Sequence, residues 1–187
     1  MSILSANQKT GKSLNLPISH TCNRACPWFD KGCYGQKGRM IWNPVTMANM
    51  ARLNGWKATP EKFWADMADE CKNLKHLRIF GVGDFPNKRF AWELVEFMKN
   101  NKQTKFWIAS FKAGKLGWHD VVDAINALPN AIIRISDQEK TTDMKYTSSV
   151  TEGSASCPAT MGKAKDCKEC GYKCWSKRVK HVTYKKH

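Results

Sequence analysis

Short apolar runs alternate with amphipathic stretches through most of this chain. Apolar runs predict strands over 77–80, 105–109 and 131–135. Alternation of apolar and polar residues predicts a further strand over 14–18. Elsewhere apolar residues recur at spacings of three and four, which predicts helices over 44–53, 60–71, 90–99 and 121–128. Thr59 and Pro60 indicate a helix start, because threonine caps a first turn and proline fits its first position.

Strands separated by helices are typical of a parallel sheet with right-handed crossovers. We therefore expect an α/β domain over residues 1–137, with a mainly parallel open sheet of four to six strands or a partial (β/α) barrel. Residues 138–156 are polar and rich in serine and threonine, which indicates a linker. A cysteine-rich knuckle and a basic tail follow, so the second predicted unit is 138–187.

Residues 6–13 match a relaxed phosphate-binding-loop pattern, with alanine in place of the first glycine. That mechanism requires a helix to open at Lys12 and Ser13, so that backbone N–H groups surround the phosphate. The alternating pattern over 14–18 and the proline within it favour a strand instead. We therefore assign no phosphate-binding loop.

The chain has 187 residues, of which 42% are hydrophobic, so it can bury a core without cross-links. No apolar run reaches about 18 residues and no secretory signal is visible, so we expect a cytoplasmic protein without a membrane span. In that compartment, eight cysteines favour metal or redox chemistry over disulfides. A disulfide-bonded protein is the alternative.

The formal net charge of +15 arises from 31 lysines and arginines against 16 acidic residues. The excess is densest at Lys9 and Lys12 and over 163–186. Such a field favours polyanions, and nucleic acid is the first partner that we expect. The alternative is a solubilising surface with a basic tail.

Four late cysteines follow the spacing C-x9-C-x2-C-x3-C: Cys157, Cys167, Cys170 and Cys174. Four thiolates suit a closed tetrahedral zinc site, and they suit a [4Fe–4S] cluster equally well. The spacing does not choose between these two.

Three early cysteines, Cys22, Cys26 and Cys33, follow the predicted strand 14–18. Ligands of α/β proteins bind at the carboxyl ends of strands, so this loop is a candidate site. Three thiolates leave one coordination position open, which His20 could fill in a zinc site. In a [4Fe–4S] cluster the fourth iron would instead be free for a small molecule. Cys71 lies on the apolar face of a predicted helix, and we expect a core thiol there.

Gly81, Gly83 and Asp84 follow the next predicted strand. Glycine permits close approach of the backbone to a ligand, and Asp84 could accept from a ribose hydroxyl or an ammonium group. A plain turn with Asp84 as a helix cap is the alternative.

This order of parts resembles the radical S-adenosylmethionine superfamily, in which three cysteines hold a [4Fe–4S] cluster and a glycine-rich segment follows the second strand. The resemblance implies that Cys22, Cys26 and Cys33 hold the cluster and that S-adenosylmethionine chelates its open iron. It implies an auxiliary cluster on the four late cysteines. Seven residues at strand ends would contact the cofactor: Gly81, Gly83, Asp84, Ser110, Lys112, Arg134 and Ser136.

The chain more closely resembles an uncharacterised phage-encoded family, through residues 9–17, the pair Cys33-Tyr34, residues 83–85 and the late cysteines. That likeness implies a location in the host cytoplasm. Two hypotheses follow: a radical enzyme, or a non-catalytic protein stapled by iron–sulfur clusters or zinc that binds nucleic acid or a host protein. No side chain stands out as a catalytic acid or base.

Overall fold

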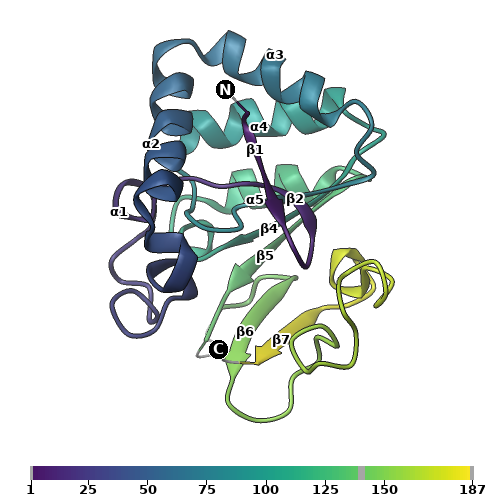
Figure 1. Cartoon of the computed structure of the whole chain (residues 1–187). Coiled ribbons are helices and arrows are strands. Elements are labelled where there is room, and N and C mark those ends of the chain that lie inside the picture. Colours follow the sequence, from purple (N-terminus) through teal and green to yellow (C-terminus); the bar gives the residue numbers. More distant parts are fainter. Residues whose placement is uncertain (1, 139–141, 186–187) are drawn as a thin grey trace.

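One sheet of seven strands runs through the computed structural model, which describes residues 2–138 and 142–185 (Figure 1). The strands, in spatial and sequence order, are β1 (Leu4–Asn7), β2 (Gly11–Leu14), β3 (His76–Ile79), β4 (Lys105–Ser110), β5 (Ala131–Ser136), β6 (Thr147–Thr151) and β7 (His181–Lys185). β1 pairs antiparallel with β2, and each later neighbouring pair is parallel. The predicted α/β class and mainly parallel open sheet are confirmed, with more strands than predicted.

Two of the unexpected strands follow residue 137. β6 lies in the predicted linker 138–156, and β7 lies in the predicted basic tail. β6 pairs with β5 and β7 pairs with β6, so edge pairing compensates for their polar composition. The sheet therefore continues past residue 137. Residues 186 and 187 of the predicted tail lie outside the described residues.

Five α-helices are described: α1 (Ile18–Thr21), α2 (Asn43–Ala58), α3 (Pro60–Cys71), α4 (Lys88–Asn100) and α5 (His119–Ala127). Short 3-10 turns add η1 (Tyr34–Gln36), η2 (Gly38–Ile41), η3 (Lys112–Gly114) and η4 (Lys173–Trp175). The predicted strand 14–18 is wrong, because β2 ends at Leu14 and Pro17 caps the start of α1. No helix formed by the described residues is long and apolar enough to cross a membrane.

The main core lies between the sheet and α3, α4 and α5, which Figure 1 shows together on one side of the strands. Ile108 and Ile133 belong to this core, whereas Trp107 and Ile132 belong to a smaller cluster with Tyr146. Successive residues of a strand point to opposite faces of a sheet, so the two clusters lie on opposite faces. Cys71 is fully buried in the main core, as predicted for a core thiol.

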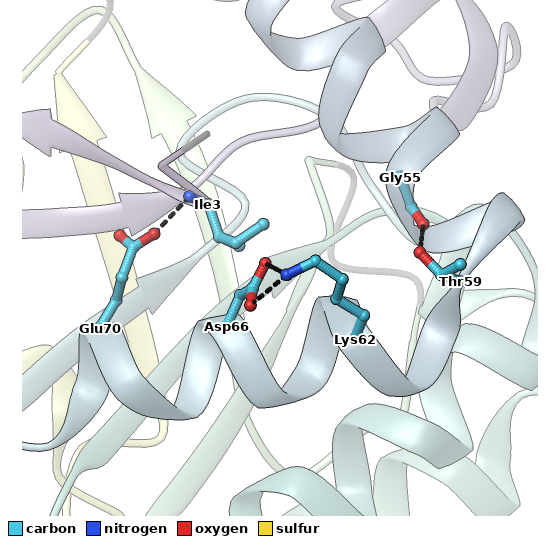
Figure 2. Close-up of polar contacts among 6 residues, drawn as sticks. All are labelled: Ile3, Gly55, Thr59, Lys62, Asp66 and Glu70. Carbon is cyan, nitrogen blue, oxygen red and sulfur yellow. Dashed lines mark hydrogen bonds and ion pairs between the residues drawn. The ribbon is translucent and has the colours of Figure 1, made fainter.

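Polar contacts of α3 fix the edge of the sheet and the junction with α2 (Figure 2). The Glu70 carboxylate accepts from the backbone N–H groups of Ile3 and Leu4, so α3 holds the start of β1. The Thr59 hydroxyl donates to the carbonyl of Gly55 at the end of α2. The contacts of Glu70 give the start of β1 hydrogen-bond partners on the edge of the sheet, where β1 has no neighbouring strand.

Candidate functional site

The cysteine loop, residues 22–33, connects α1 to η1. Backbone hydrogen bonds fold it into tight turns, including those from Cys26 N–H to the Asn23 carbonyl and from Cys33 N–H to the Trp28 carbonyl. Its three thiols are half-buried. Burial, followed by the nearby charge of Asp84, raises the pKa of Cys22 to about 12. The loop therefore lies next to Asp84, as the strand-end argument predicts.

Asp84, Ser110 and Lys112 come together at the carboxyl ends of β3 and β4. The buried Asp84 carboxylate accepts from the Ser110 hydroxyl at 2.6 Å and from the backbone N–H of Lys112 at 3.0 Å. It also accepts from the backbone N–H groups of Phe85 and Phe111. Burial raises the pKa of Asp84, and the hydrogen bond from Ser110 opposes that shift.

The Lys112 ammonium group completes this arrangement by donating to the carbonyls of Thr21 and Phe85. Burial lowers the pKa of Lys112, and the charge of Asp84 opposes this effect. The loops that follow α1, β3 and β4 are thus joined by side-chain hydrogen bonds. These polar atoms make structural contacts within the protein.

The two glycines that precede Asp84 are required by packing. A Cβ atom at Gly81 would collide with the Asn15 side chain, and one at Gly83 would lie 2.5 Å from the Leu16 carbonyl oxygen. Gly83 also has a φ of +88°, a conformation that favours glycine. The close approach made by this segment is therefore to the chain that follows β2.

Arg134 and Ser136 lie further along the sheet, on β5. Arg134 is fully buried, and its guanidinium donates to four backbone carbonyls, those of Cys174, Ser176, Val179 and Lys180. It therefore holds the C-terminal segment, which we define as residues 157–180 between β6 and β7. Ser136 lines a shallow pocket with Phe111 and Lys115, beside the cysteine loop.

The four late cysteines lie in the C-terminal segment. The backbone N–H of Cys167 donates to the Lys9 carbonyl, and the Cys170 thiol donates to the Cys167 carbonyl. Burial raises the pKa of Cys167 to about 11 and that of Cys174 to about 12, and neighbouring cysteines add to both shifts. The four are thus close enough to influence one another, and Cys167 and Cys174 favour the protonated thiol.

The cofactor prediction is wrong. All eight cysteines fall within the described residues and are free, and these residues contain no group of three or more His, Cys, Asp or Glu that could hold a metal ion. Metal ligation requires several ligands whose donor atoms converge on one point, and the described residues hold no such group. We therefore withdraw the [4Fe–4S] clusters, the S-adenosylmethionine that one of them would bind, and the zinc alternative.

Arg78 on β3 joins the two cysteine-bearing regions. Its guanidinium donates to the Tyr34 hydroxyl at 3.3 Å and lies over the Trp107 ring, 4.6 Å from its centroid. Its charge also acts on Cys167, whose pKa it lowers against the larger effect of burial. Residues that follow the cysteine loop and residues of the C-terminal segment therefore approach the same face of the sheet, opposite the main core.

Positive charge is concentrated in the two stretches that approach this face of the sheet. Residues 163–185 contain eight lysines and arginines against two acids, and residues 24–39 contain four against one. We call the exposed cations of these two stretches the basic face: Arg24, Lys31, Lys37, Arg39, Lys163, Lys165, Lys168, Lys173, Arg178, Lys180 and Lys185. In Figure 1 the first stretch lies at the left, beside α1 and the lower end of α2, and the loops of the second stretch lie at the lower right, before β7.

The helical side differs because several of its cations form ion pairs. Ion pairs there include Lys62–Asp66 on α3, Arg89–Glu93 on α4, and Lys88–Asp120 between α4 and α5. Sequence counting found the excess of positive charge but not this separation of paired from clustered cations, which depends on the fold.

A family model described as Gene product 88 matches residues 3–185, which is nearly the whole chain. The chain belongs to the Gene product 88 family. This match supports the phage-type family predicted from the sequence and does not support the resemblance to radical S-adenosylmethionine proteins. No curated protein and no solved structure matches the chain. Membership in the Gene product 88 family therefore comes without a described reaction, and function has to be argued from the surface.

Proposed function

We propose that this Gene product 88 protein binds nucleic acid through the basic face. The observation that carries the proposal is a chain of contacts through Arg78. Its guanidinium contacts Tyr34 of the first cationic stretch and the Trp107 ring, which packs against Trp175 of the second stretch. Two cationic stretches that are distant in sequence thus approach the same face of the sheet. A concentrated field of one sign attracts a polyanion more strongly than the same charges scattered over the surface. Lysine side chains that contact phosphates release bound counterions, which supplies affinity without sequence preference.

The exposed lysines of the C-terminal segment are the natural phosphate contacts. Lys163, Lys165, Lys168 and Lys173 are exposed, and they are carried by a segment that Arg134 anchors to the sheet. Lys177 differs, because its ammonium group donates to the carbonyls of Asn126 and Leu128. Burial lowers the pKa of Lys177, as expected for a structural contact.

Replacing those four exposed lysines with glutamine should lower affinity for an oligonucleotide by at least about tenfold at moderate salt. It should also reduce the slope of log affinity against log salt by about three to four, because each lost phosphate contact removes nearly one unit. Fluorescence anisotropy with a labelled oligonucleotide measures both quantities. Thermal unfolding should be almost unchanged, since these side chains are exposed.

The matched control removes the same charge from the helical side, by replacing Lys57, Lys62, Lys72 and Lys99 with glutamine. These lysines are also exposed, and three of them form ion pairs on the helices. We expect this variant to retain most of the affinity. Equal losses in the two variants would show that net charge alone attracts the oligonucleotide, and a wild-type protein that does not bind would overturn the proposal.

A further inference from the structure

Large apolar side chains are exposed together in the segment from η1 to the first turn of α2. Tyr34 is 42% exposed, Ile41 and Trp42 are each 58% exposed, and Met47 is 70% exposed. A folded domain rarely leaves several such side chains in water along one short segment unless the surface binds something. We call residues 34–47 the aromatic segment.

Cations are interleaved with these apolar side chains. Lys37 and Arg39 are exposed, and the Arg39 guanidinium lies 5.9 Å from the centroid of the Trp42 ring. Arg78 donates to the Tyr34 hydroxyl, so the segment adjoins the face that also receives the C-terminal segment. Residues 34–47 contain no Asp or Glu. The surface thus combines flat apolar groups with positive charge.

This combination favours one kind of occupant. A second copy of the chain meeting here would bring Lys37 and Arg39 of both copies together, and like charges oppose such an interface. Duplex nucleic acid offers phosphates but keeps its bases stacked inside. Single-stranded nucleic acid offers phosphates and unpaired bases together, and bases stack readily on exposed aromatic rings.

We infer that the basic face binds single-stranded nucleic acid in preference to duplex and that the aromatic segment stacks its bases, with Trp42 as the main platform. The inference rests on the proposed function and names its substrate class. Tyr34, held by Arg78, supplies a second ring from the same segment. Lys37 and Arg39 contact the phosphates between stacked bases.

The test compares affinities for an oligothymidylate, an oligouridylate and a DNA duplex of the same length, by anisotropy. The Trp42→Ala variant should lose about tenfold in affinity for the single strands, which is the typical contribution of one stacked base, and little for the duplex. Trp42→Phe should retain most of the affinity, because phenylalanine still offers a ring. The two single strands show whether DNA or RNA is preferred.

Trp92→Ala is the matched control, because Trp92 is also exposed, at 40%, but lies on α4 on the helical side. It should leave every affinity unchanged. Equal affinity of the wild type for single strand and duplex, or equal behaviour of the Trp42→Ala and Trp92→Ala variants, would overturn this inference. The proposed function would then still stand on the lysine variants. It fails if the wild-type protein binds no nucleic acid or if the two lysine variants lose affinity equally.

Discussion

Replacing Arg134 with methionine should release the C-terminal segment from the sheet and lower the free energy of unfolding by about 3–5 kcal/mol, as expected when a buried charged partner is removed. Arg134 is fully buried, and its guanidinium donates to four carbonyls between Cys174 and Lys180 at 2.8–3.2 Å. Methionine has a similar apolar volume but no donor. The variant leaves those carbonyls without their partner in a region that excludes water.

Denaturant unfolding measures the loss of stability, and limited proteolysis locates it. New cleavage sites should fall within residues 157–180, because that segment loses its attachment before the main core does. Arg178→Met is the control, since Arg178 is exposed in the same segment, and it should unfold like the wild type. Superimposable unfolding curves for the Arg134→Met variant and the wild type would contradict the anchoring role.

The Arg134→Met variant also tests the proposed function. Lys163, Lys165, Lys168 and Lys173 are presented by the segment that Arg134 anchors. Detaching the segment leaves the net charge of the chain almost unchanged. The four lysines, however, are no longer held together at one place on the surface. We expect oligonucleotide affinity to fall even though these four lysines are still present, because a concentrated field is needed.

Replacing Asp84 with alanine is the second change for which we expect a large effect, a loss of about 3 kcal/mol or more in the free energy of unfolding. The Asp84 carboxylate accepts from the Ser110 hydroxyl and from three backbone N–H groups, those of Phe85, Phe111 and Lys112. Alanine leaves these donors without their acceptor. Lys112 also loses the charge that opposes the effect of its burial.

Asp84→Asn should lower the free energy of unfolding by less than Asp84→Ala, because the amide oxygen still accepts hydrogen bonds. Some loss is expected, because the amide NH2 group faces the remaining donors. Asp123→Ala removes an exposed carboxylate of α5 and serves as the control, with almost no expected change. Denaturant midpoints of the three variants give the comparison. If Asp84→Ala were as stable as Asp123→Ala, the loops after α1, β3 and β4 would not depend on this carboxylate.

The local pattern of apolar and polar residues predicted the helices and strands whose side chains are most deeply buried. The apolar runs of β4 and β5 and the amphipathic helices α3, α4 and α5 occur within a few residues of their predicted bounds. Burial of one face imposes a period that is visible in the sequence. β6 was missed because Thr147–Thr151 contains a single apolar residue. β7 was missed because the alternation of Val182 and Tyr184 with polar residues is short and lies in a strongly basic stretch. Each strand is stabilised by pairing with its neighbour.

The residues of the candidate site likewise divide into those whose position followed from the sequence and those whose role did not. Parallel strands end at one edge of a sheet, so the sequence was sufficient to predict that residues following β3 and β4 would meet, and Asp84 does contact Ser110 and Lys112. Arg134 stands between Ile133 and Ile135, which face the main core. The alternation of a strand could therefore have shown that Arg134 points to the other face.

By itself, the sequence determined the α/β class, the main helices, the excess of positive charge and the family. Each of these depends on local periodicity, on composition or on similarity along the chain. Only the tertiary structure could show that the part of the chain it describes holds no group of three or more metal-ligating side chains, because spacing along a chain does not specify where sulfur atoms converge. It also decided that Arg134 anchors the C-terminal segment and that Tyr34 and Trp175 meet the same face of the sheet around Arg78 and Trp107, because both depend on contacts between residues far apart in sequence.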